Sequence, residues 1–159
     1  MSLLIPATPL LIAMRDLEAG VQEIPGSEHH PRITEALRFV RFATAPKDET
    51  PHCAAMVCLW LREAGVRDGP ETASARGILA HGHHVRRQEA KPGDVPVFWR
   101  GRADDGVTGH TGILCDVPSS PIQLTVVGAN QREFGADRVS IKELLVGRLL
   151  GIRRFEWAA

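Results

Sequence analysis

The feature that most constrains the fold is a change in hydrophobic pattern along the chain. In the first half, apolar residues recur at helical spacing between capping signals. From the Lys91–Asp94 turn onward, short apolar runs alternate with glycine- and proline-bearing turns, which is typical of strands. Helices followed by adjoining strands predict an α+β domain, in which N-terminal helices pack on an antiparallel sheet of about five strands.

The helical half contains four segments with start and stop signals. Proline opens three of them, where its missing N–H costs nothing, and glycine follows the ends of three. Thr8 is expected to cap the first helix. The expected helices begin at Pro9, Pro31, Cys53 and Pro70, and they end at Gly20, before Pro46, at Gly65 and at Ala80.

The strands are expected at residues 95–99, 110–117, 122–127, 139–141 and 149–155. Pro118–Pro121 is a turn between the second and third of these strands. If those strands pair across it, positions symmetric about residue 120 face each other. Pro96 within the first strand indicates an edge or a bulge.

Length and charge limit the class of protein. The 159 residues fit a single domain spanning 1–159. Lys plus Arg equals Asp plus Glu at 19 each, which argues against nucleic acid or an anionic membrane as the main partner. The three cysteines predict no disulfide framework and favour a reducing compartment. The first residues, Met1–Pro6, lack a basic region, so we expect cytoplasmic synthesis without a signal peptide and no membrane insertion.

Cys53 stands where a polar loop enters an apolar helix. In the first helical turn, unpaired N–H groups and the positive end of the helix dipole stabilise a thiolate. Cys58 falls inside the apolar pattern and is expected to be structural. The sequence therefore predicts that Cys53 is the reactive thiol and that its pKa is lowered.

A thiol nucleophile needs a base and a polar group that orients the base. His110 begins a strand, and the flanking Gly109 and Gly112 permit close approach of another backbone. Strand pairing about residue 120 brings His110 and Asn130 to the same end of the sheet. Gln131 is the alternative orienting amide, and the sequence does not decide between the two.

Each of these features also has a structural interpretation. A lone strand histidine is often structural, and an asparagine after a strand is often part of a turn. Asp48 and Glu49 either bind a substrate amino group or, as favoured here, serve the helix cap and loop. His81, His83 and His84 are an alternative metal site, although their spacing fits a solvated histidine cluster better than a zinc pattern.

Several short motifs occur together in a fixed order over nearly the whole chain. They are Glu23–Gly26, His30–Ile33, Asp48–Ala55, Lys91–Val95, Gly109–Gly112, Gly128–Gln131, Ser140–Ile141 and Arg148–Gly151. In this ordered set the chain resembles the papain-like cell-wall hydrolases of the NlpC and CHAP type, particularly a short branch in phage-like and bacterial peptidoglycan-degrading proteins. The resemblance implies a papain-like fold.

The resemblance also implies a function. Cys53 would be the nucleophile, His110 the general base and Asn130 the orienting group, cleaving amide bonds of peptidoglycan stem peptides through an acyl-enzyme without metal or organic cofactor. The Cys53 N–H and the His52 side chain would be the oxyanion donors. His52 stands where such proteins commonly have Trp, and Gly128 where CHAP-type members often have an acidic residue, so the exact substrate stays open.

The remaining expectations concern partners and location. The stem peptide is the expected partner, with an immunity or inhibitor protein as a second one, and we expect a monomer. The protein would act in the periplasm or cell wall, as a phage lysin or a secreted antibacterial effector. The alternative of a different class is a non-catalytic module that binds peptidoglycan or serves as a phage structural component.

Overall fold

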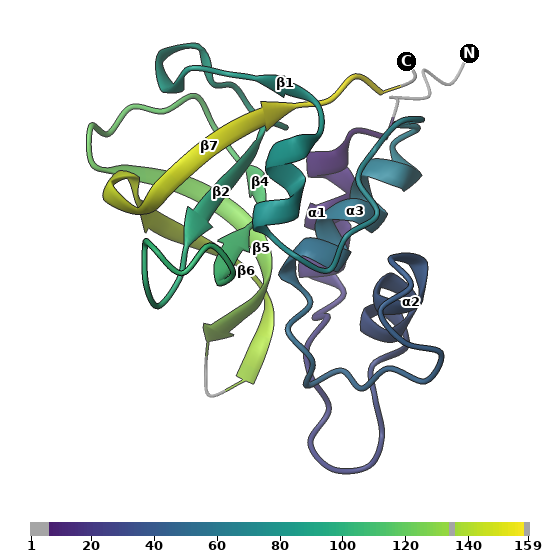
Figure 1. Cartoon of the computed structure of the whole chain (residues 1–159). Helices are drawn as coiled ribbons and strands as arrows, with labels where there is room; N and C mark the ends of the chain where they lie inside the picture. The colour runs from purple at the N-terminus through teal and green to yellow at the C-terminus, as the bar shows by residue number, and fades with distance from the viewer. Residues whose placement is uncertain (1–6, 134–135, 158–159) are drawn as a thin grey trace.

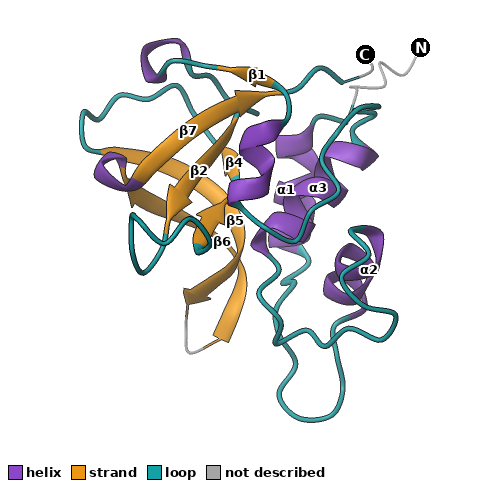
Figure 2. Ribbon diagram, viewed as in Figure 1, coloured by secondary structure: helices purple, strands orange, loops and turns teal. Residues whose placement is uncertain are grey.

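A computed structural model describes residues 7–133 and 136–157 (Figure 1). The α+β prediction is confirmed, because the α-helices gather on one side of the molecule and the strands, with the short η2 and η3, on the other (Figure 2). The elements are α1 (Pro9–Glu18), α2 (Pro31–Phe39), α3 (Cys53–Glu63), η1 (Arg76–Ala80), β1 (His83–His84), η2 (Arg87–Glu89), β2 (Val95–Trp99), β3 (Gly109–Thr111), β4 (Ile113–Leu114), β5 (Gln123–Glu133), β6 (Ala136–Leu145), η3 (Val146–Arg148) and β7 (Leu149–Arg154). The segment 1–6, on which the expectation about a signal peptide depends, lies outside the described residues.

The described strands form two antiparallel sheets, not the single sheet of about five strands that the sequence predicted. One sheet has the order β1-β7-β2-β3 and the other β4-β5-β6. The chain crosses between them at Gly112, which divides the predicted strand 110–117. A Cβ at Gly112 would meet the carbonyl oxygen of Val127 and lie 2.5 Å from Val126 Cγ1. The expected close backbone approach at Gly112 is therefore confirmed, and only glycine fits there.

The register predicted across the Pro118–Pro121 turn is confirmed. Ile113 pairs with Val127 and Leu114 pairs with Val126, and both pairs are symmetric about residue 120. The first predicted strand also has the observed bounds of β2, and its irregularity falls between Val97 and Phe98. This register fixes the end of the sheet to which the Gly128–Gln131 segment belongs.

Helix α3 is the centre of the core. Every residue from Cys53 to Leu61 is buried, so the helix is enclosed all round and not only along one stripe. The Trp60 indole N–H donates to the Asp16 carboxylate at 2.7 Å, and Arg32 Nε donates to the same carboxylate at 2.9 Å. These bonds join α1, α2 and α3 around one buried charge, which fixes the three helices relative to one another.

The helix boundaries follow the sequence signals in three of four cases. The Thr8 hydroxyl accepts from the Leu11 N–H at 3.1 Å, and Gly20 adopts a φ of 68° after α1. The helix predicted from Pro70 is wrong, because only the short η1 forms there. The Ser74 N–H bonds to the Thr72 hydroxyl at 3.0 Å, a local contact that competes with helix formation. In the described part of the chain, no helix is long and apolar enough to span a membrane.

Candidate functional site

Cys53 is the first residue of α3, where the helix has no side-chain cap. The backbone N–H groups of Cys53 and Ala54, from the first helical turn, approach its sulfur, and so does that of Thr111 on β3. Sheet and helix therefore meet at this sulfur atom. All three cysteines are free thiols, but Cys53 is the one at a helix N-terminus.

The expectation that the pKa of Cys53 is lowered is wrong. Burial raises this pKa above its ordinary value of 9.0. The Thr111 N–H, the positive charge of Arg100 and the helix N–H groups act in the opposite direction and are outweighed. In this structure Cys53 is a buried, protonated thiol.

His110 lies on β3 and is held by Gln131. Its Nε2 is 2.8 Å from Gln131 Oε1, while the Gln131 amide nitrogen donates to the Ser140 carbonyl at 2.7 Å and to the Ser140 hydroxyl oxygen at 3.2 Å. These contacts fix the orientation of the Gln131 amide, so its oxygen must accept a hydrogen bond from His110. The proton of neutral His110 therefore resides on Nε2, and Nδ1 carries the lone pair that a general base needs.

Asn130 does not make the contact predicted for it. Two residues of β5, Ala129 and Asn130, oppose the single residue Val139 of β6, which is a β-bulge. Asn130 adopts a φ of 58° there, and within the described structure its side chain has no hydrogen bond. Because the extra residue shifts the alternation, Gln131 lies on the same strand face as Gly128, and a regular two-residue pattern in the sequence could not have identified it.

Arg100 is a site residue that the sequence reasoning missed. Its Nη2 lies 3.5 Å from His110 Nδ1 and donates to the carbonyl oxygen of Asn130 at 3.4 Å. Burial lowers the pKa of His110 to about 4, opposed by the Gln131 hydrogen bond and assisted by the positive charge of Arg100. In the described structure, no hydrogen bond joins the Cys53 sulfur to the His110 ring. Thiol and imidazole are thus both neutral, with a guanidinium beside the base nitrogen.

His52 precedes Cys53, but its ring is engaged elsewhere. Nδ1 donates to the carbonyl oxygen of Thr50 at 2.8 Å, and burial lowers the pKa of this histidine. The ring is 1% exposed and neutral, so its proton is held by Thr50 and is not directed at an oxyanion. The predicted role of His52 as an oxyanion donor is therefore not supported, which leaves backbone N–H groups as the donors at this site.

Asp48 organises the loop before α3 and does not cap the helix. One carboxylate oxygen accepts from the N–H groups of Ile24 and His30, both at 2.8 Å, and the other lies 3.0 Å from His29 Nδ1. Burial raises the pKa of Asp48, but the hydrogen bonds outweigh it and lower the pKa overall. Of the favoured expectation of a helix cap and a loop role, Asp48 has the loop contacts and not the cap.

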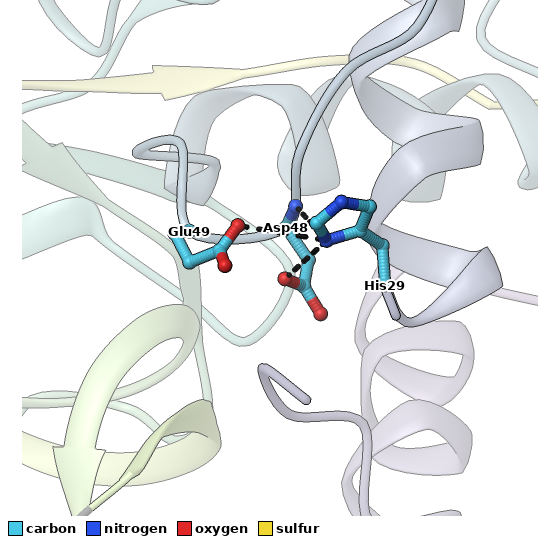
Figure 3. Close-up of side chains that lie close together, drawn as sticks. All are labelled: His29, Asp48 and Glu49. Atoms are coloured by element: carbon cyan, nitrogen blue, oxygen red, sulfur yellow. Dashed lines mark hydrogen bonds and ion pairs between the residues drawn. The ribbon is translucent and has the colours of Figure 1, made fainter. Parts of the chain in front are cut away.

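His29, Asp48 and Glu49 are grouped closely enough to hold a metal ion (Figure 3). Glu49 Oε2 also lies 3.5 Å from His29 Nδ1 (Figure 3). The His29 ring nitrogen and both Asp48 oxygens already have hydrogen-bond partners. These contacts explain why the three side chains lie together.

The alternative metal site at His81, His83 and His84 lacks the required geometry. His83 and His84 are successive exposed residues of β1, so their side chains project from opposite faces.

Gly109, expected to support the site, begins β3, and a Cβ there would lie 3.0 Å from the Phe98 carbonyl oxygen. This close approach allows β3 to deliver His110 beside β2.

Comparison of the chain with protein-family models and with curated protein sequences finds no match. The site is therefore interpreted from its own geometry. Hydrogen bonds join His110 on β3 to Gln131 on β5 and to Arg100 after β2, and Cys53 on α3 is reached by the charge of Arg100 and by the N–H of Thr111, the residue after His110. A thiol, an oriented imidazole and three backbone N–H groups on these adjoining segments are the groups needed for acyl transfer.

Proposed function

We propose that this protein is a cysteine hydrolase that cleaves amide bonds in peptidoglycan stem peptides. The observation that carries the proposal is the oriented imidazole of His110, whose Nε2 is held by Gln131. The strand β3, which bears His110, also brings the Thr111 N–H to the Cys53 sulfur. The assignment to peptidoglycan and to a papain-like fold rests on the ordered motifs that resemble NlpC and CHAP proteins. Gln131 takes the orienting role here in place of Asn130.

The reaction begins with proton transfer. The S–H bond of Cys53 breaks and an N–H bond forms at His110 Nδ1, which produces a thiolate and an imidazolium. The thiolate adds to the amide carbonyl, and the N–H groups at the start of α3 and of Thr111 are the donors available for the developing oxyanion. The imidazolium then protonates the leaving amine. Water, deprotonated by the neutral imidazole, releases the acyl group as a carboxylic acid.

The test is digestion of purified sacculi followed by mass spectrometry of the released fragments. Wild-type protein should release soluble peptides, while Cys53→Ala and His110→Ala should release none. Fragment masses distinguish an endopeptidase from an amidase. A chelator-treated sample tests the alternative of a metal enzyme, because loss of cleavage with chelator but not with Cys53→Ala would exclude the thiol mechanism.

A second function, binding without cleavage, is favoured by one observation. The Cys53 thiol is buried with a raised pKa, and the pKa of His110 is about 4, so the resting pair is neutral. A module that only holds peptidoglycan would co-sediment with sacculi equally well as wild type and as Cys53→Ala, and neither form would release fragments. As a hydrolase, the protein would act in the periplasm or cell wall, and an immunity or inhibitor protein would be its second partner.

A further inference from the structure

Arg100 is a cation without an anionic partner at the candidate site. Its Nη2 contacts a ring nitrogen of His110 at 3.5 Å and a carbonyl oxygen at 3.4 Å, and both distances are long for hydrogen bonds. Across residues 7–133 and 136–157, no carboxylate lies within ion-pair distance of this guanidinium. Arg32 and Arg154, by contrast, each contact a carboxylate at less than 3.0 Å. The fork of Arg100 is thus available to an external anion.

The same guanidinium lines a surface cavity that opens beside His110. The cavity walls are Phe98, Trp99, Arg100, His110, Glu143, Leu144, Leu145 and Arg148. The Arg148 guanidinium stacks on the Trp99 ring at 4.7 Å from the ring centroid, and no described carboxylate is paired with it either. Two guanidinium groups against the single carboxylate of Glu143 give the cavity a positive charge next to the base.

Guanidinium groups recognise carboxylates with two parallel N–H bonds, so the chemistry of this cavity fits an acidic ligand. We propose that Arg100 is a specificity-determining residue that binds a substrate carboxylate close to the scissile amide and, in doing so, leaves the Nδ1 atom of His110. This inference rests on the proposed function. Arg100 would favour stem peptides that carry a free carboxylate beside the cleaved bond over stem peptides in which that carboxylate is amidated.

The consequence for the chemistry follows from the contact at Nδ1. In the resting site the Arg100 guanidinium lies 3.5 Å from Nδ1, beside the lone pair that must receive the Cys53 proton. A carboxylate that binds the guanidinium frees this lone pair without any change at Nε2, which stays with Gln131. The S–H proton of Cys53 can then pass to Nδ1. Binding of the correct substrate and activation of the thiol are thereby coupled.

A test that does not require peptidoglycan uses two alkylating agents that differ only in charge. Iodoacetate carries a carboxylate and iodoacetamide carries an amide, and both react with a thiolate by forming a C–S bond and expelling iodide. We define the selectivity as the rate with iodoacetate divided by that with iodoacetamide, each normalised to free cysteine. Peptide mass spectrometry assigns the modification to Cys53 and separates it from Cys58 and Cys115.

Wild-type protein should show a selectivity well above one, and Arg100→Gln should lower it at least fivefold. Arg100→Lys should fall between them because it keeps the charge but loses the fork. Arg102→Gln is the matched control, since Arg102 lies two residues away and pairs with Asp104. It should match wild type. A selectivity that changes less than twofold in Arg100→Gln would overturn the inference.

A second experiment compares stem peptides with a free and an amidated carboxylate beside the cleaved bond. Wild type should prefer the free acid in kcat/KM, and Arg100→Gln should lose the preference mainly by slowing the free acid. Equal cleavage of both peptides by wild type overturns the inference while the hydrolase proposal stands. A selective alkylation with no cleavage of any peptide instead refutes the hydrolase proposal and leaves Arg100 as a carboxylate-binding residue.

Discussion

Replacing Gln131 by alanine should damage the site far more than removing the side chain of its neighbour Asn130. The Gln131 amide bridges His110 and Ser140 through contacts of 2.8 Å and 2.7 Å. Alanine leaves the His110 Nε2–H and the Ser140 carbonyl without these partners in a buried region. Each buried unpaired group costs about 1–3 kcal/mol, so Gln131→Ala should lower the free energy of unfolding by about 2–4 kcal/mol.

The matched control is Asn130→Gly. Asn130 has a φ of 58°, which glycine adopts without strain, and the described structure gives its side chain no hydrogen bond. Asn130→Gly should therefore change the unfolding free energy by less than about 1 kcal/mol. Both variants keep the backbone carbonyl that accepts from Arg100.

Three measurements separate the two variants. Urea denaturation gives the unfolding free energy, and sacculus digestion gives activity, which should fall about 10–100-fold in Gln131→Ala if one to two orienting hydrogen bonds are lost. The NMR resonance of the His110 Nε2 proton should persist in wild type and Asn130→Gly and disappear in Gln131→Ala. If Asn130→Gly loses this resonance while Gln131→Ala keeps it, the assignment of Gln131 as the orienting residue is refuted.

Three further predictions concern stability and charge. Asp48→Ala should lower the unfolding free energy by about 2–4 kcal/mol in urea, because it leaves two part-buried N–H groups without their acceptor. Since the pKa of Asp48 is lowered on folding, its contribution should be present above pH 4 and be lost as the pH falls through the folded value. NMR titration should place the pKa of His110 near 4, and because the unfolded chain binds this proton at higher pH, stability should fall as the pH drops from 6.5 towards 4. Gly112→Ala should destabilise the fold by more than about 2 kcal/mol in thermal or urea unfolding, since a Cβ would meet the Val127 backbone.

The sequence was informative wherever the structure depends on local signals. Thr8 and Gly20 bound α1 as predicted, and the turn at Pro118–Pro121 set the register of β4 against β5. These features depend on a few neighbouring residues, whose capping and turn chemistry acts independently of the rest of the chain. The position of Cys53 at the start of α3 was predicted for the same reason.

The features that could not be predicted arise from contacts between distant segments. The division into two sheets depends on the approach of Gly112 to Val127, and although the glycine indicated a close approach, nothing local indicated that the sheet divides there. The bulge at Asn130 likewise depends on β6, which determines where an extra residue of β5 is tolerated. Arg100 is one of 19 basic residues, and only its position beside His110 distinguishes it.

The energetics of the resting site explain why a partner for Arg100 matters. Because burial raises the pKa of the Cys53 thiol and lowers that of the His110 imidazole to about 4, the proton stays on sulfur in the resting site and its transfer to His110 is strongly unfavourable. The positive charge of Arg100, 3.5 Å from the ring, repels an imidazolium and adds to the effect of burial, which is the larger cause of the lowered His110 pKa. A carboxylate that draws Arg100 from Nδ1 removes much of this repulsion, and substrate that covers the site must supply the remainder. An uncharged alkylating agent leaves the repulsion in place, so slow reaction with iodoacetamide and faster reaction with iodoacetate are two consequences of the same charge.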